Sequence, residues 1–214
     1  MIERVNRRYL GLGICILFLC CFLGVARADR IVLAPMAETP DPNSLGLSGL
    51  LTPYRHDNSF LWLRYASAQG IELELQRAAL LPDPKTRYTF DVEYPLTFDF
   101  GGLPAIALGV RDLFGTGDEH GALYAVVSHS PIIPERLKPF LNHFRLTAGV
   151  GTGTMDGLFV GVQAKMLGSV TLSAELYRRQ PNFGLNLPVV RGMSADVASI
   201  NGTIYYGFSV HIVR

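Results

Sequence analysis

Cysteine is almost absent from this chain, because its three cysteines, Cys15, Cys20 and Cys21, all lie within the first 28 residues. The rest of the chain can form no disulfide, no thiolate metal site and no cysteine nucleophile. Basic residues are not in excess either. Four of the 19 lysines and arginines and one of the 18 acidic residues lie in the same 28 residues, which leaves 15 basic and 17 acidic residues beyond them. This balance predicts no nucleic-acid partner.

The first 28 residues have the composition of an export signal. Three arginines precede residues 10–25, which are almost wholly apolar, and Ala26 and Ala28 then supply the small residues of a cleavage site. We expect cleavage before Asp29. The alternative is a retained helical anchor, because residues 9–26 are just long enough to span a bilayer.

Charged residues are scarce at 17%, whereas 49% of the residues are hydrophobic. The chain is therefore too apolar to be disordered, and its length suits a single folded domain. Residues 29–43 contain three prolines and no hydrophobic period, which predicts an irregular periplasmic or extracellular leader before the regular structure begins. We divide the chain into a signal peptide at residues 1–28, a leader segment at 29–43 and a β-domain at 44–214.

A helical period is also missing beyond the signal. Apolar residues instead recur at every second position in short runs, separated by glycine, proline, asparagine and aspartate, which predicts strands joined by turns. Asn201-Gly202 has the composition of a two-residue hairpin turn, whereas Gln180-Pro181-Asn182 is expected to break the chain. The fold class is therefore an all-β antiparallel meander. The expected strands span residues 44–51, 58–66, 70–79, 86–95, 104–112, 121–129, 143–150, 157–166, 169–178, 183–190, 193–199 and 203–213.

One face of these strands is apolar and the other is mixed. The mixed face combines charges with small residues such as Ala105, Ala107 and Gly109, which suits a crowded interior where opposite charges pair. With the export signal and the aromatic residues near strand ends, this pattern predicts a meander closed into a transmembrane β-barrel of about 10–12 strands. We expect the cell outer membrane as its location and outer-membrane lipid against its apolar face. The alternative is a secreted soluble β-barrel binding protein, in which the apolar face forms the core.

The charges on the mixed face are the candidate functional residues. They can form a salt-bridged plug that rigidifies the barrel, or they can line a narrow path for small polar solutes. The plug is favoured, because opposite charges on neighbouring strands neutralise each other. The expected lumen charge network comprises Arg87, Asp91, Glu93, Arg111, Arg145, Lys165 and Glu175.

Two loops share the pattern GTGxxxG, at residues 115–121 and 151–157, and each precedes a predicted strand. Phosphate-binding glycine loops precede helices, so repeated hairpins explain this pattern better than a nucleotide site. The first loop also contains three residues that can bind metals: Asp118, Glu119 and His120. A hydrated loop tip explains them better, because no second pair of ligands stands at a matching spacing. We therefore expect no metal and no cofactor.

Serine and histidine also occur close together on either side of a predicted connection. These residues could supply a nucleophile and a base, although ordinary strand ends explain them better, and we expect no enzyme. The residues concerned are Ser128, His129, Asn142 and His143.

Residues 103–117, LPAIALGVRDLFGTG, resemble a segment of the YjbH family of outer-membrane β-barrel proteins, which are linked to exopolysaccharide production. In that family a Pro-x-Ala/Ile-Leu-Gly run leads into an aspartate and then Gly-Thr-Gly, here Asp112, Gly115, Thr116 and Gly117. The resemblance implies an outer-membrane barrel that is structural or accessory to exopolysaccharide production or export. It also implies polysaccharide or the export machinery as partners, and it brings no catalytic residues. A small polar-solute channel is the alternative.

Overall fold

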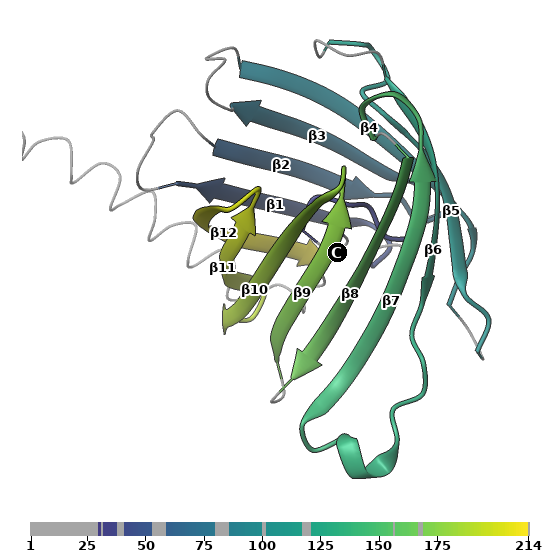
Figure 1. Ribbon diagram of the computed structural model, residues 1–214, viewed down its shortest axis with the longest axis vertical. Helices are drawn as coiled ribbons and strands as arrows, with labels where there is room; N and C mark the ends of the chain where they lie inside the picture. Colours follow the sequence, from purple (N-terminus) through teal and green to yellow (C-terminus); the bar gives the residue numbers. More distant parts are fainter. Residues whose placement is uncertain are drawn as a thin grey trace, which may run out of the picture.

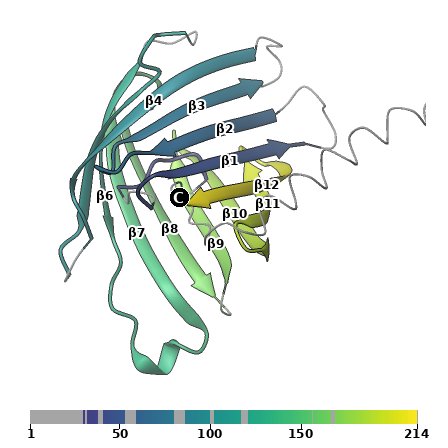
Figure 2. The ribbon, with the colours of Figure 1, turned by 180° about the vertical axis from the view of Figure 1, so that it is seen from behind.

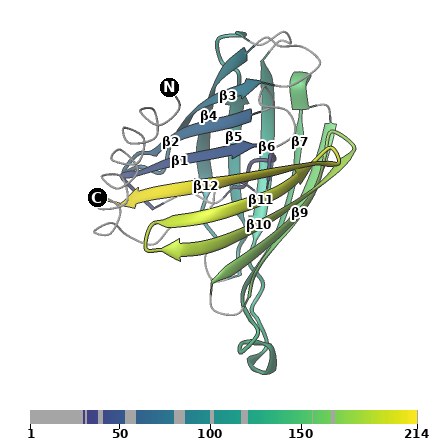
Figure 3. The ribbon, with the colours of Figure 1, turned by 90° about the vertical axis from the view of Figure 1, so that its left-hand side faces the viewer.

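Twelve antiparallel strands close into a barrel in the computed structural model. The structure describes residues 30, 32–37, 41–52, 59–79, 86–99, 102–116, 121–155, 157–166 and 169–213. Each strand pairs with its neighbours in sequence, and β1 pairs with β12 to close the barrel (Figures 1 and 3). The strands are β1 (Ser44–Leu51), β2 (Ser59–Ala66), β3 (Glu72–Ala79), β4 (Thr86–Thr97), β5 (Ala105–Arg111), β6 (Ala122–His129), β7 (Leu141–Gly151), β8 (Gly157–Met166), β9 (Val170–Tyr177), β10 (Gln180–Val190), β11 (Met193–Ile200) and β12 (Thr203–Val213).

The predicted all-β antiparallel meander is confirmed, and each expected strand corresponds to an observed one. The Asn201-Gly202 turn has positive φ at both residues, as a tight hairpin turn of the predicted kind requires. The expected break at residues 180–182 was wrong. The chain turns earlier, at Arg178 and Arg179, which also have positive φ, and β10 then begins at Gln180. Sequence missed this turn because arginine rarely adopts such a conformation.

The apolar face of the strands points outward and the mixed face lines the interior. On β12, Tyr206 is 52% exposed whereas its neighbour Tyr205 is 2% exposed. The same alternation runs around the barrel, with exposed Leu63, Leu108 and Val160 on outward positions. Successive side chains of a strand point to opposite faces, so the alternation in each strand places apolar residues on the outer face of the sheet and mixed residues on the inner face.

Both ends of the β-meander lie at the same end of the barrel, because the number of strands is even and all connections join neighbours. We call this the terminal end. The β6–β7 connection, which contains the 3₁₀ turn η1 (Glu135–Leu137), also lies there and extends away from the strands (Figure 2). The β5–β6 and β7–β8 connections lie at the opposite end, and the second contains the 3₁₀ turn η2 (Gly153–Met155). Among the described residues, no helix is long and apolar enough to span a bilayer.

Aromatic side chains fold over glycines inside the barrel. Tyr124 stands directly across from Gly109, and Phe159 directly across from Gly149. A Cβ atom at either glycine would overlap the opposite ring. Small residues on the mixed face therefore make room for the large ones that fill the lumen.

We expect Gly149→Ala to lower the free energy of unfolding by about 1–3 kcal/mol, because the Phe159 ring must move within a filled interior. The matched control is Gly46→Ala on β1, where the nearest atom to a new Cβ is the Cβ of Arg64 at 3.8 Å. Urea unfolding followed by the gel shift of the folded barrel compares the two. Equal free energies of unfolding for the two variants would show that Gly149 is not needed to make room for the Phe159 ring.

Candidate functional site in the barrel lumen

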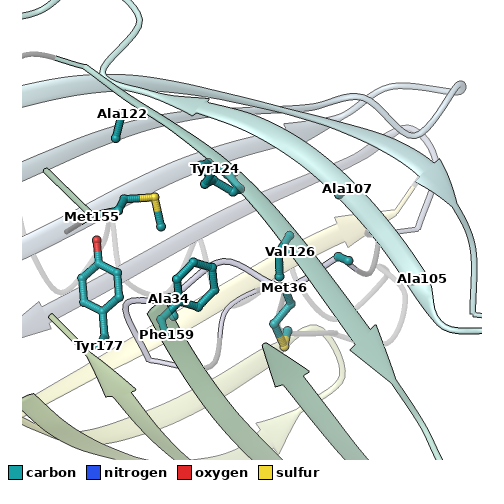
Figure 4. Close-up of a cluster of buried hydrophobic side chains, with 11 residues drawn as sticks. Ala34, Met36, Ala105, Ala107, Ala122, Tyr124, Val126, Met155, Phe159 and Tyr177 are labelled. Carbon is teal, nitrogen blue, oxygen red and sulfur yellow. The ribbon is translucent and has the colours of Figure 1, made fainter. Parts of the chain in front are cut away.

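The N-terminal part of the described chain lies inside the barrel. We call residue 30 together with residues 32–37 the inner segment. Ala34 and Met36 are at most 1% exposed, and Figure 4 shows them beside Phe159, Tyr124 and Tyr177 of the barrel wall. The expectation of a leader outside the barrel is thus corrected for these residues. The backbone of the inner segment is irregular, as predicted, but it lies inside the lumen.

The carboxylate of Glu175 on β9 holds the inner segment through three consecutive backbone amides. The N–H groups of Val32, Leu33 and Ala34 donate to it at 2.9–3.1 Å. Asn182, directly across on β10, donates a further hydrogen bond at 2.8 Å. Successive amides that point the same way form a concave anion site. The segment therefore adopts a shape that fits one carboxylate.

Arg30 anchors the start of the segment to the opposite wall. Its Nε donates to Glu74 at 2.8 Å, and its second terminal nitrogen contacts the other Glu74 oxygen. The same guanidinium lies 3.6 Å from Asp91 on β4 and donates to the Leu33 carbonyl at 2.8 Å. Arg64 on β2 also pairs with Glu74, at 3.2 Å. Bidentate arginine–carboxylate pairs are strong and directional, so Arg30 sets the position of the segment.

Arg111 links this charged wall to the far side of the lumen. Its Nε donates to Asp91 at 3.1 Å, and another nitrogen donates to the Tyr177 hydroxyl on β9. It also donates to the Leu33 carbonyl at 3.3 Å. Ion pairs and hydrogen bonds thus connect β3, β4 and β5 through the inner segment to β9 on the other side of the lumen.

The predicted lumen charge network divides into two groups. Asp91, Arg111 and Glu175 meet at the inner segment. The other four members lie on the lumen wall. Glu93 accepts a hydrogen bond from the Tyr124 hydroxyl at 2.9 Å, and Arg145 donates to Ser130 at 3.3 Å and to His143 at 3.0 Å. Lys165 borders a cavity, and Arg87 is half-buried on β4.

Two residues at the centre of the observed network are not members of the predicted one. Glu74 stands on the mixed face of β3, where the alternation of the sequence already places it, but it was left out of the predicted network. Arg30 lies in an irregular segment, where no period indicates which side chains face inward. Its partner Glu74 is 44 positions away in sequence.

The residues that resemble the family motif build a turn. Asp112 is buried with positive φ; its N–H donates to Asp91 at 2.9 Å, and its carboxylate accepts from the Thr116 N–H at 3.0 Å. Gly115 donates its N–H to the Asp112 carbonyl at 3.0 Å, and the Thr116 hydroxyl donates to the Tyr88 carbonyl on β4. Gly117 lies outside the described residues. This arrangement gives the motif a structural role.

The second copy of the repeat makes an equivalent connection. Thr152 donates its N–H to the Leu123 carbonyl at 2.9 Å, and its hydroxyl accepts from the Leu123 N–H at 3.1 Å. Each threonine therefore ties its loop to the strand that lies before the hairpin: Thr116 binds β4, and Thr152 binds β6. This supports the interpretation of the repeat as repeated hairpins.

The other candidate sites do not come together as a reactive group. Ser128 is buried and shares a hydrogen bond of 2.9 Å with Thr147, whereas His129 next to it points to the other face, 3.7 Å from Asp99. His143 lies 3.4 Å from Ser130, but its ring nitrogen also accepts from Arg145. The possible metal ligands at positions 118–120 lie outside the described residues. Within the described residues, no three His, Cys, Asp or Glu side chains are grouped to hold a metal.

A cavity of about 620 Å³ remains in the lumen beside the inner segment. Residues of β1, β2 and β7 to β12 line it, together with Arg30 and Val32. The lumen therefore contains both the inner segment and an unfilled space beside it.

The chain matches no protein-family model, no curated protein and no solved structure.

We expect loss of the Glu175 carboxylate to release the inner segment, because three amides and Asn182 lose their common acceptor. Glu175→Ala should lower the free energy of unfolding by about 3–5 kcal/mol. It should also expose position 36. Residues 29–214 contain no cysteine, so a Met36→Cys variant of this part of the chain carries one buried thiol whose reaction with a maleimide reports release. Labelling should be at least about 10-fold faster with Glu175→Ala.

Asp196→Ala is the matched control. Asp196 is an inward carboxylate on β11 that accepts from Asn186 and Ser209 rather than from the inner segment. The thiol at position 36 should stay protected in that variant. Equal labelling in both variants would show that Glu175 does not hold the segment.

Proposed function

We propose that this chain is an outer-membrane β-barrel protein closed by its own N-terminal segment, with a structural or accessory role in exopolysaccharide production or export. One observation carries the membrane part of this proposal: the apolar side chains of the barrel point outward and the charged ones point inward.

The outward surface has the chemistry of a lipid contact. Large apolar side chains are exposed on strands around the barrel, among them Leu45, Leu61, Leu75, Leu108, Val127, Leu146, Val160, Leu172 and Phe208. A soluble barrel would bury such residues in its core and expose its charges. A closed barrel also pairs the backbone groups of its strands and leaves no sheet edge, as a bilayer requires. These two features support membrane insertion over secretion as a soluble binding protein.

The filled lumen supports a structural role over a channel. The inner segment crosses the interior and is held by ionic hydrogen bonds on two walls, through Glu74 and Glu175. A channel for small polar solutes would need a continuous water path, whereas here buried side chains occupy the middle of the barrel.

The link to exopolysaccharide rests on the resemblance of residues 103–117 to the YjbH family. Asp112, Gly115 and Thr116 form an ordered turn at one barrel end, which is consistent with a retained structural motif. On this proposal the partners are polysaccharide or the export machinery.

The barrel is expected to partition with outer-membrane fractions and to migrate faster on gels before boiling than after it. Both follow from a closed barrel with a lipid-facing apolar surface, because such barrels resist unfolding by detergent until they are heated. A fully soluble product with identical migration before and after boiling would contradict the membrane proposal.

In planar bilayers the purified wild type should give no resolved channels, because the inner segment blocks the lumen. A variant that lacks residues 30–37 but keeps the signal cleavage site should give discrete conductance steps, since the blocking group is gone. Lys138→Gln, an exposed substitution on the β6–β7 connection, is the control and should stay silent. Well-resolved channels in the wild type would instead favour the solute channel.

A further inference from the structure

The inner segment has the shape of a hairpin. Arg30 and Pro35 form an antiparallel β-bridge, and the chain bends at residues 32–34 between them. The chain therefore reverses its direction inside the lumen. We call residues 32–34 the tip of the hairpin. Its two arms are Arg30 on one side and the stretch from Pro35 to Ala37 on the other.

The tip points away from the terminal end of the barrel. Glu175, which binds the amides of the tip, lies two positions before Tyr177, where β9 ends at the opposite end. The Leu33 carbonyl also accepts a hydrogen bond from Arg111 at 3.3 Å, and Arg111 is the last residue of β5, again at the opposite end. The tip therefore lies in the half of the lumen that is farther from the terminal end.

Both arms lead back toward the terminal end. The N–H of Ala37 donates to the Ser128 hydroxyl at 3.0 Å, and Ser128 is the second-last residue of β6, beside the terminal end. Gln163 donates to the Arg30 carbonyl at 2.8 Å, and it lies in the half of β8 that is nearer to the terminal end. A hairpin with this orientation can leave the lumen on the terminal side without threading the chain through the barrel.

The unfilled space beside the hairpin also lies on the terminal side. The cavity of about 620 Å³ borders Arg30 and Val32. It extends to Ser44 at the start of β1 and to His211 near the end of β12, both at the terminal end. The hairpin therefore has space beside it in the direction in which its arms lead.

The lumen is filled at the opposite end. Phe159 and Tyr177 are buried there and pack edge to face, with their ring centroids 6.2 Å apart. Met155, in the β7–β8 connection, is 0% exposed within the same cluster of buried side chains. These packed side chains oppose a movement of the hairpin toward the opposite end, because a close-packed interior has no room for a further group.

Charged groups of the wall hold the hairpin, and water can take its place. The Glu175 carboxylate binds the amides of the tip, and the Glu74 carboxylate binds Arg30. When the hairpin leaves, these carboxylates face an enlarged polar space, which water fills because it finds hydrogen-bond partners there. Hydration removes much of the cost of a buried charge without its partner, so the wall can exist in both states.

We propose that the inner segment is a retractable gate. It leaves and re-enters the lumen as a hairpin through the terminal end, and the carboxylates of Glu74 and Glu175 fasten it in the closed state. In the open state water hydrates both carboxylates. This inference rests on the proposed function, in which the segment closes the barrel, and it adds that the closure is reversible and has one direction.

A reversible lock tests the movement. Residues 29–214 contain no cysteine, so Ala37→Cys with Ser128→Cys introduces one pair, at positions that the 3.0 Å hydrogen bond holds close enough for a disulfide. In planar bilayers Glu175→Ala should give openings that alternate with closures, at the conductance of the variant that lacks residues 30–37. The disulfide should abolish these openings, and dithiothreitol should restore them. If Glu175→Ala does not fold, Arg30→Gln replaces it.

Labelling from one side of the membrane tests the direction. Met36→Cys in the Glu175→Ala background is combined with Lys138→Cys, exposed at the terminal end, or with Leu113→Cys, 48% exposed at the opposite end. Proteoliposomes receive an external polyethylene-glycol maleimide that is too large to cross the lumen. Exit through the terminal end predicts two attached polymers on the same molecules with Lys138→Cys and one per molecule with Leu113→Cys. This count does not depend on how the barrels are oriented in the vesicles.

The opposite pattern, two polymers per molecule with Leu113→Cys, would overturn the proposal. So would openings that the disulfide leaves unchanged, a Glu175→Ala channel that never closes, or Glu175→Ala and Arg30→Gln variants that stay closed while the variant without residues 30–37 conducts. A deletion variant that does not conduct would contradict closure by the segment itself, and the gate would fall together with that part of the proposed function.

Discussion

The carboxylates of Glu74 and Glu175 are the groups on which the interior of this barrel depends. Each is buried in the lumen, where an unpaired charge is strongly unfavourable. Glu175 is compensated by the amides of the inner segment and by Asn182, and Glu74 by Arg30 and Arg64. The wall and the segment therefore supply each other's ion-pair and hydrogen-bond partners. Removing either one leaves buried polar groups of the other without these partners.

The outer surface and the interior of the barrel need different side chains, and every strand contributes to both. Outward positions carry leucine, valine and aromatic residues, whereas inward positions carry charges, hydroxyls and glycines. Because successive side chains of a strand point to opposite faces, alternating apolar and polar residues supply both surfaces from the same strand. A shift of one residue would place charges outside and apolar side chains inside, so the register is strongly specified.

The interior is filled unevenly, and a cavity of about 620 Å³ remains beside the inner segment. Near β5 to β9, aromatic rings lie over glycines and pack against Ala34 and Met36, which leaves little space. Near β1, β11 and β12, a second cluster of buried apolar side chains fills part of the interior, and serines of the same strands line a cavity. The inner segment thus closes the lumen and borders the cavity that remains.

The sequence alone determined the strands, their order and the separation of faces, because these depend on a local period and on turn residues such as Asn201-Gly202. It also indicated Asp91, Arg111 and Glu175 as inward charges, since they stand on the mixed face of regular strands. Only the tertiary structure decided what those charges bind. Glu74 and Glu175 bind the same inner segment, yet the amides that Glu175 accepts from lie more than 140 positions away from it in the sequence. An irregular backbone has no period, so no local pattern encodes a partner at that distance.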